Sequence, residues 1–272
     1  MKLLSELLYK TGIEEVKGNI NLAITSICFD SRKVIRDSLF IATRGTTVDG
    51  HTFIDKTIEE GAVAIICEEF PDEILERITY VKVTSSSKAL GIIAANFYDN
   101  PSENLKLIGI TGTNGKTTTA TLLYLLFRGL GKKVGLLSTV KNRILGETIP
   151  STHTTPDAIA INELLAEMVS KGCNYCFMEV SSHAIHQNRI AGLAFDLALF
   201  TNITHDHLDY HNTFDEYIKA KKKFFDDLPS FTKAITNADE RHGNTMVLNT
   251  KAEVKKYGLK AMADYKCRLV EN

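Results

Sequence analysis

Short apolar runs alternate with amphipathic stretches along most of this chain. After residue 100, the apolar runs predict strands at Lys106–Ile110, Val134–Leu137, Tyr175–Val180, Leu197–Asn202 and Ala234–Asn237. Between these runs, apolar positions recur at helical spacing over Thr117–Leu130, Ala158–Val169 and Phe214–Leu228. Apolar strands that alternate with helices favour a mostly parallel sheet covered by helices on both faces.

A smaller α/β unit is expected before residue 100. Its pattern predicts helices at Leu3–Tyr9, Phe53–Glu60 and Ser86–Tyr98, and strands at Ala23–Phe29, Ser38–Ala42, Val63–Cys67 and Tyr80–Val83. A turn-forming stretch around Asn100 and Pro101 follows this unit. We therefore expect an α/β chain with two domains, which cover residues 1–99 and 100–272.

Composition excludes several classes of protein. The 272 residues are 44% hydrophobic, which is enough for a sizeable core, and a net charge of −1 gives no electrostatic reason to bind nucleic acid. No apolar run reaches the roughly 18 residues of a membrane span. The five scattered cysteines, including the Cys173 and Cys176 pair, favour buried reduced thiols in a cytoplasmic protein.

The stretch Leu105–Thr119, LKLIGITGTNGKTTT, has the pattern of a phosphate-binding loop. A buried strand, a glycine-rich turn and a helix start follow one another, and backbone N–H groups at such a helix start bind anions. Lys116 is expected to reach the outer phosphates, and the Thr117 hydroxyl is expected to bind Mg²⁺. Only two residues separate Gly112 and Gly115, whereas the ordinary P-loop has four. The Lys-Thr pair nevertheless favours nucleotide binding over a plain connecting turn.

The third strand of this region ends at Glu179 and leads into a polar loop, MEVSSHAIHQNR. A carboxylate that leaves a buried strand beside a P-loop is well placed to hold Mg²⁺, and the alternative is an exposed strand-end acid. Ser181, His183, Gln187 and Arg189 follow, and the guanidinium of Arg189 suits a carboxylate or a phosphate. Taken alone, each of these four residues fits a surface position better than a ligand-binding one.

The next strand is followed by TNITHDHLDYH, in which His205, His207 and His211 stand close together. Histidine and aspartate in such density resemble a metal site. Their spacing does not require them to face one point. We expect one or two of them to contribute and the others to lie on the surface.

Residues 151–156, STHTTP, precede a predicted helix. Threonine followed by proline is an ordinary signal for a helix start. The same hydroxyl and N–H groups could also bind an anionic substrate, and the residues alone do not separate the two interpretations.

The helix Phe214–Leu228 contains a lysine that faces the interior. At about 100° per residue, Lys221 falls at the centre of a stripe, which is formed by Phe214, Tyr217, Ile218, Phe224, Phe225 and Leu228. An interior lysine needs a partner. Its neutral amine can also react with CO₂ to give an anionic carbamate, which can bind Mg²⁺. The alternative is a lysine that extends to solvent at the edge of the stripe.

As a set, these motifs resemble the Mur ligase family. GTNGKTT, HTTPD, MEVSSHAIHQNR, TNITHDHLDYH and the helix lysine occur in the family's order, and FDSRKVIRDSLFIATRGTTVDGHTFI resembles its uridine-binding domain. The resemblance covers essentially the whole chain. It implies a small N-terminal α/β domain followed by a P-loop, mostly parallel-sheet ATPase domain. That second domain is expected to be incomplete at its C-terminus, and the family's third domain has no counterpart here.

The resemblance also implies roles for individual residues. Lys116, His207 and a carbamylated Lys221 would be catalytic. ATP would be bound by Gly112, Thr113, Asn114, Gly115, Lys116, Thr117, Thr118 and Asn237, and Mg²⁺ by Thr117, Glu179, His207 and Lys221. The muramoyl-dipeptide would contact His153, Thr154, Thr155, Ser181, Gln187 and Arg189, and the uridine diphosphate would contact Phe29, Ser31, Thr46, Thr47 and Val48.

The implied activity is ATP-dependent amide formation in peptidoglycan precursor synthesis. A diamino acid would be joined through an acyl phosphate to UDP-N-acetylmuramoyl-L-alanyl-D-glutamate, with meso-diaminopimelate favoured over L-lysine. Lys116 and two Mg²⁺ ions would offset the repulsion between the reacting anions. We expect a cytoplasmic monomer without a nucleic-acid partner. Because no third domain is expected, this chain alone is expected not to turn over.

Three other interpretations remain open at this point. A ligase of the folylpolyglutamate type shares the P-loop and the helix lysine, but it begins directly at the ATPase domain. A non-catalytic nucleotide-binding module would not need Lys116, Glu179, His207 and Lys221 together. A simple P-loop hydrolase would not need a lysine inside the helix stripe.

Overall fold

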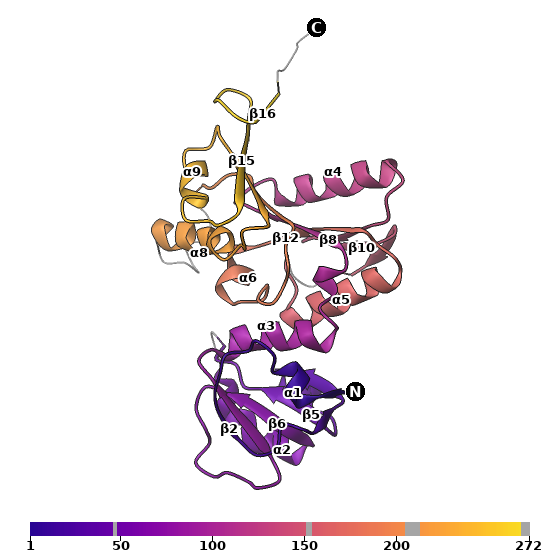
Figure 1. Cartoon of the computed structure of the whole chain (residues 1–272), viewed down its shortest axis with the longest axis vertical. Helices are drawn as coiled ribbons and strands as arrows, with labels where there is room; N and C mark the ends of the chain where they lie inside the picture. The colour runs from indigo at the N-terminus through magenta and orange to yellow at the C-terminus, as the bar shows by residue number, and fades with distance from the viewer. Residues whose placement is uncertain (46–47, 151–153, 205–212, 268–272) are drawn as a thin grey trace. The chain divides into compact units, whose positions relative to one another are not determined.

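The computed structural model describes residues 1–45, 48–150, 154–204 and 213–267. The chain forms two compact units (Figure 1). The first unit comprises Met1–Pro101, Asp157–Glu163 and Gln187–Leu193, and the second comprises Ser102–Pro156, Leu164–His186 and Ala194–Asn272. Both units contain helices and a mainly parallel sheet, so the predicted fold class is confirmed.

The first unit contains a five-stranded sheet in the order β2-β7-β6-β5-β4. Its strands are β2 (Ile13–Lys17), β4 (Ser26–Cys28), β5 (Ser38–Ile41), β6 (Ala62–Cys67) and β7 (Thr79–Val83). β4 to β7 are parallel, and β2 joins β7 as an antiparallel edge strand. The sequence pattern missed β2, because four of its five residues are exposed and no apolar alternation marks it.

Helices cover both faces of this sheet. The short strands β1 (Lys2–Leu3) and β3 (Ala23–Ile24) pair separately, and the helices are α1 (Leu4–Leu7), α2 (Ile54–Glu59) and α3 (Ser86–Phe97). Leu39 and Ile41 on β5 enter the core that contains residues of α1 and α3, whereas Phe40 enters the core that contains residues of α2. β5 is therefore buried on both faces, as its continuous apolar sequence predicts.

The second unit is built on a nine-stranded sheet in the order β11-β10-β9-β12-β8-β13-β14-β15-β16. The parallel strands are β8 (Lys106–Thr111), β9 (Val134–Leu137), β12 (Tyr175–Glu179), β13 (Leu197–Phe200), β14 (Lys233–Asn237), β15 (Glu253–Gly258) and β16 (Tyr265–Lys266). β10 (Asn142–Ile144) and β11 (Glu147–Ile149) form an antiparallel hairpin at one edge. The hairpin, β15 and β16 were not predicted, because these strands are short or rich in charged residues.

The helices of the second unit are α4 (Lys116–Gly129), α6 (Ser182–His186), α8 (Phe214–Asp226), α9 (Gly243–Met246) and, from Leu164 on, α5 (Ala158–Ser170), whose first residues belong to the first unit. Figure 1 shows α4 on one side of the strands and α6 on the other. Ala120 and Tyr124 of α4 pack with residues of β8, β9 and β12. β8 lies between β12 and β13, so the loops after these three strands meet at one edge of the sheet. In the part of the chain that the structure describes, no helix is long and apolar enough to cross a membrane.

Candidate nucleotide and metal site

The loop between β8 and α4 needs glycine at two positions. Gly112 has φ of 147° and Gly115 has φ of 84°, which L side chains rarely adopt. A Cβ atom at Gly112 would lie 1.9 Å from Oγ1 of Thr201. Gly115 caps the N-terminus of α4, so the positive end of a 14-residue helix begins at this loop. The loop therefore has the geometry of an anion site.

Lys116 places a positive charge on this loop. Its ammonium donates hydrogen bonds of 2.9 Å to the carbonyl oxygens of Gly112 and Thr113. Asn114 and Thr118 are exposed at the same turn. The predicted ATP-binding residues 112–118 thus form the loop after β8 and the first turn of α4, with a cation at the helix start.

Glu179 is fully buried at the end of β12, next to this loop. Its Oε2 accepts hydrogen bonds from the hydroxyls of Thr117 at 2.9 Å and Thr139 at 3.1 Å. Its Oε1 accepts one from the backbone N–H of Thr139 at 2.8 Å. β8 and β12 pair in register from Tyr175–Lys106 to Glu179–Ile110, which brings the carboxylate beside the start of α4.

This group of oxygen atoms fits Mg²⁺. A carboxylate and two hydroxyls are the hard oxygen ligands that Mg²⁺ prefers. Thr117 and Glu179 would hold the ion, as predicted, and Thr139 is a third candidate that sequence analysis missed. Thr139 follows β9 by two residues. The rule that ligands bind at the carboxyl ends of parallel strands could have found it.

A second metal site remains a prediction. Within the described ranges, no group of three or more His, Cys, Asp and Glu side chains is arranged to hold a metal ion. His205, His207 and His211 lie outside the described residues, as do His153, Thr46 and Thr47. The predicted contributions of His207 to a metal and of His153, Thr46 and Thr47 to substrate binding are therefore untested.

Lys221 of α8 points into the protein, which confirms the helix-stripe prediction. Only 1% of its surface is exposed. Its Nζ donates a 2.9 Å hydrogen bond to the carbonyl oxygen of Gly112 and lies 4.7 Å from the ring centre of Tyr217. Lys222 and Lys223 instead pair with Asp226 and Asp227 on their own helix. The interior lysine therefore contacts the loop of residues 112–115 directly, and this loop is called the phosphate loop below.

Two of the predicted dipeptide-binding residues lie beside Glu179. The Thr155 hydroxyl donates a hydrogen bond of 2.9 Å to the backbone carbonyl of Glu179. The N–H of Ser181 donates to the same hydroxyl at 3.2 Å, and the Ser181 hydroxyl accepts from the N–H of Ala184 at the start of α6. Thr154, which precedes Thr155, is half-buried. Thr155 and Ser181 thus stand close to Glu179, a candidate Mg²⁺ ligand.

The other predicted substrate residues belong to the first unit. The Arg189 guanidinium donates hydrogen bonds of 2.9 Å and 2.6 Å to Oε1 of Gln187. Phe29 and Ser31 follow β4, and the exposed Val48 follows β5. Because β4 and β5 are parallel neighbours, the residues that follow them lie along one sheet edge.

A polar network at this same edge was not expected from the sequence. The guanidinium of Arg44 lies 3.4 Å from the carboxylate of Glu68. That carboxylate accepts hydrogen bonds from the N–H and hydroxyl of Ser86, while the Glu68 N–H donates to Nε2 of His51 at 2.8 Å. The network ties the loops after β5 and β6 to the start of α3. It therefore shapes the edge where Phe29, Ser31 and Val48 lie.

Asn237 ends β14 and contacts the neighbouring strand. Its Nδ2 donates a 2.9 Å hydrogen bond to the carbonyl of Thr201, and its Oδ1 accepts from the N–H of Asp239 at 3.0 Å. Thr201 in turn contacts the phosphate loop. β14 is separated from β8, which the loop follows, by β13 alone, and this position is compatible with the expected role near adenine.

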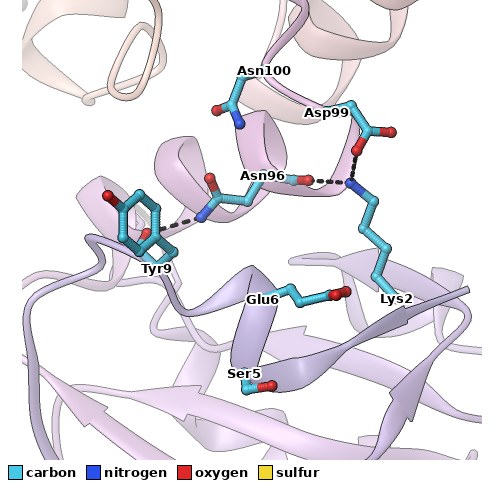
Figure 2. Close-up of a pocket in the computed structure, with 7 residues that line it drawn as sticks. All are labelled: Lys2, Ser5, Glu6, Tyr9, Asn96, Asp99 and Asn100. Carbon is cyan, nitrogen blue, oxygen red and sulfur yellow. Dashed lines mark hydrogen bonds and ion pairs between the residues drawn. The ribbon is translucent and has the colours of Figure 1, made fainter.

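The first unit also has a polar cavity of about 510 Å³. It is lined by Lys2, Ser5, Glu6, Tyr9, Asn96, Asp99 and Asn100, none of which was predicted to bind a ligand. Figure 2 shows the Lys2 ammonium bonded to the Asn96 carbonyl oxygen at 2.6 Å and to the Asp99 carboxylate at 2.5 Å. These contacts join the N-terminus to the end of α3, so a structural role accounts for them.

Two protein families match separate parts of the chain. The family described as "Mur ligase middle domain" matches residues 110–271, and the family described as "Mur ligase family, catalytic domain" matches residues 23–98. The first match alone covers more than half of the chain.

Individual relatives match over nearly the whole chain. UDP-N-acetylmuramoyl-L-alanyl-D-glutamate--2,6-diaminopimelate ligase of Cytophaga hutchinsonii is 57% identical over 268 residues, which are 98% of this chain and 55% of the relative. The corresponding ligase 1 of Clostridium acetobutylicum is 43% identical and covers 93% of this chain and 52% of its own length.

A solved structure of a ligase with the same enzyme name superimposes with a TM-score of 0.81 at 25% identity. The match covers 97% of this chain and 54% of that one, so the chain spans about half the length of the proteins it matches. These matches agree with the glycine-rich loop, the buried strand-end carboxylate and the interior lysine. The chain belongs to the Mur ligase family.

Proposed function

We propose that this chain supplies the nucleotide- and UDP-substrate-binding parts of an ATP-dependent amide ligase. The ligase adds meso-2,6-diaminopimelate to UDP-N-acetylmuramoyl-L-alanyl-D-glutamate. The observation that carries the proposal is the contact between Thr117 and Glu179 beside the Lys116 loop, because it unites a nucleotide site with a Mg²⁺ site. Relatives that are 43% and 57% identical carry the name of this reaction.

The reaction joins a carboxylate to an amine at the expense of ATP. An oxygen of the D-glutamyl side-chain carboxylate attacks the γ-phosphorus, and ADP leaves. The amine then attacks the acyl carbon, phosphate leaves and the amine releases a proton. Lys116 would bind the outer phosphates, and Thr155 and Ser181 would orient the dipeptide. Mg²⁺ held by Thr117 and Glu179 would reduce the repulsion between the two reacting anions.

Lys221 has a further role in this proposal. We assign it as a carbamate, formed when its neutral amine attacks CO₂ and loses a proton, that helps His207 to hold a second Mg²⁺. Its burial supports this assignment, because a buried position protects a carbamate from solvent. Carbon-13 NMR with labelled bicarbonate should give a carbamate signal that is absent from a Lys221→Met variant. An identical spectrum from the variant would remove the carbamate from the mechanism.

The UDP-substrate and ATP would be bound mainly by different domains. We assign residues 1–99 to UDP-substrate binding and residues 100–272 to ATP binding. The compact first unit supports this division, and the segment with Gln187 and Arg189 clusters with it although it lies far along the chain. We further propose a cytoplasmic monomer, in which the five cysteines remain free thiols.

Direct binding tests this function. Calorimetric titration of the chain should show binding of ADP with Mg²⁺ and of UDP-N-acetylmuramoyl-L-alanyl-D-glutamate. A folate substrate and UDP-N-acetylglucosamine are titrated in the same way as comparison ligands. Binding of the folate without binding of the UDP-linked dipeptide would replace the proposal with a ligase of the folylpolyglutamate type.

A further inference from the structure

The residues that follow β13 form hydrogen bonds with the phosphate loop of the second unit. The backbone carbonyl of Asn202 accepts a 2.8 Å hydrogen bond from the N–H of Thr113. The side-chain amide of Asn202 contacts both backbone polar groups of Asn114, the residue after Thr113. Its Oδ1 accepts from the Asn114 N–H at 2.9 Å, and its Nδ2 donates to the Asn114 carbonyl at 3.1 Å. The Thr201 hydroxyl donates to that carbonyl at 2.7 Å. The Asn202 side chain thus fixes the orientation of Asn114 in the loop.

A second element holds the other side of this turn. Tyr217 of α8 is fully buried, and its hydroxyl lies 3.1 Å from the Thr113 hydroxyl. The Thr113 hydroxyl also accepts from the N–H of Thr204 at 3.0 Å. One helical turn further along α8, Lys221 bonds to the carbonyl of Gly112. α8 therefore contacts two successive residues of the loop.

These contacts matter because the loop is short. A loop that binds phosphate through backbone N–H groups must hold those groups in one orientation before the ligand arrives, or the ordering reduces affinity. Only two residues lie between Gly112 and Gly115, and the Lys116 ammonium contacts the carbonyls of Gly112 and Thr113. The Asn114 backbone and the Thr113 hydroxyl are contacted from β13 and α8, so their orientation depends on Asn202 and Tyr217.

We propose that Asn202 and Tyr217 are positioning residues of the phosphate loop, which act on the nucleotide through Thr113 and Asn114. This inference rests on the proposed function, because it requires that the loop bind nucleotide phosphates. Neither side chain needs to touch the ligand. Their loss should weaken binding of the outer phosphates and leave the fold intact.

The test for Tyr217 has a matched control in the same unit. Tyr217→Phe removes the hydroxyl and keeps the buried ring. Tyr124→Phe removes a hydroxyl that is also buried, but for which the described residues offer no hydrogen-bond partner. We expect Tyr217→Phe to weaken binding of ADP with Mg²⁺ about threefold to tenfold, the range expected for one net hydrogen bond. Tyr124→Phe should bind like the wild type.

Asn202 is tested by two variants. Asn202→Ala removes both side-chain hydrogen bonds to Asn114. Asn202→Asp keeps the acceptor for the Asn114 N–H and loses the donor to its carbonyl. Binding of ADP should fall in both variants, because Asn202→Ala removes both contacts and the carboxylate of Asn202→Asp faces the Asn114 carbonyl and adds a negative charge beside the phosphate site. AMP, which lacks the outer phosphate, should lose less affinity than ADP in every positioning variant, whereas general damage to the fold would weaken both nucleotides equally.

The outcomes distinguish a failure of the proposed function from a failure of the positioning role of Asn202 and Tyr217. A wild-type chain that does not bind ADP with Mg²⁺ would overturn the proposed function and this inference with it. A wild type that binds, together with Tyr217→Phe and Asn202→Ala variants of unchanged affinity, would overturn the inference alone. Equal losses for AMP and ADP, or a lower unfolding temperature without ligand, would assign both side chains to stability and also overturn it.

Discussion

The hydroxyl of Thr117 donates a 2.9 Å hydrogen bond to Oε2 of Glu179, although 62 residues separate the two along the chain. Thr117 lies in the first turn of α4, and Glu179 is the last residue of β12. Parallel pairing of β8 with β12 brings both to one sheet edge. Two motifs that the sequence shows separately thus form one oxygen-rich site beside the phosphate loop.

Removing the charge of Glu179 should weaken the Mg²⁺-dependent part of nucleotide binding. Glu179→Gln keeps an oxygen that can accept from Thr117 and Thr139, but it lacks the negative charge that attracts the ion. We expect Mg²⁺ affinity in the presence of ADP to fall at least about tenfold, the lower end of the loss when a metal site loses a supporting residue. Titration of Mg²⁺ at fixed ADP measures this.

Glu147→Gln is the control for that experiment, because it removes an equal charge from an exposed carboxylate on β11. It should leave Mg²⁺ affinity unchanged. Equal affinities in Glu179→Gln and the wild type would mean that the buried carboxylate does not hold the ion.

Gly112→Ala should destabilise the chain. The new Cβ would lie 1.9 Å from the Thr201 hydroxyl and 2.9 Å from the Asn202 carbonyl, at a φ of 147°. Strain and overpacking of this kind cost about 1–3 kcal/mol. Gly129→Ala, in the last turn of α4 with no atom within 4 Å, is the matched control and should stabilise the chain by up to about 1 kcal/mol. Urea unfolding of both variants measures the two changes, and equal midpoints would contradict the expectation.

Thiol reactivity should distinguish one cysteine from the other four. Cys267 is exposed, whereas Cys28, Cys67, Cys173 and Cys176 are buried. Burial raises the pKa of the Cys28 thiol to about 12 and that of Cys67 to about 11, so thiolate is scarce at neutral pH. A thiol reagent at pH 8 should modify one cysteine of the native chain, and Cys267→Ser should abolish that reaction. Rapid modification of a second thiol in the folded chain would contradict this expectation.

The stabilising effect of Asp30 should depend on pH on the acid side. Hydrogen bonds from the Arg32 guanidinium lower the pKa of the Asp30 carboxyl from 3.8 to about 2. Because the folded pKa is the lower one, the contribution is complete above the ordinary pKa and disappears as the pH falls toward 2. Asp30→Asn should lose less than about 1 kcal/mol at pH 7, since Arg32 is exposed.

Thermal unfolding between pH 7 and pH 2 measures this dependence. The stability difference between wild type and Asp30→Asn should shrink steadily below pH 4. A difference that stays constant over this range would show that the ion pair with Arg32 does not contribute.

Features that depend only on neighbouring residues could be predicted from the sequence. The glycine-rich turn, the strand that precedes it and the helix that follows are local patterns, and the structure confirms each of them. The inward direction of Lys221 also follows from helical periodicity alone, and its 1% exposure confirms it. These predictions hold because the spacing of side chains within one helix or strand is set by local backbone geometry.

The contacts between these local features depend on how distant segments pack together. Thr139, Asn202 and Tyr217 contact the site only because the strand order β9-β12-β8-β13 and the packing of α8 bring them to it. The edge strand β2 also depends on tertiary pairing, since its exposed residues give no periodic signal. Strand order and helix packing depend on burial between segments far apart in the chain, and no local pattern of residues records that free energy.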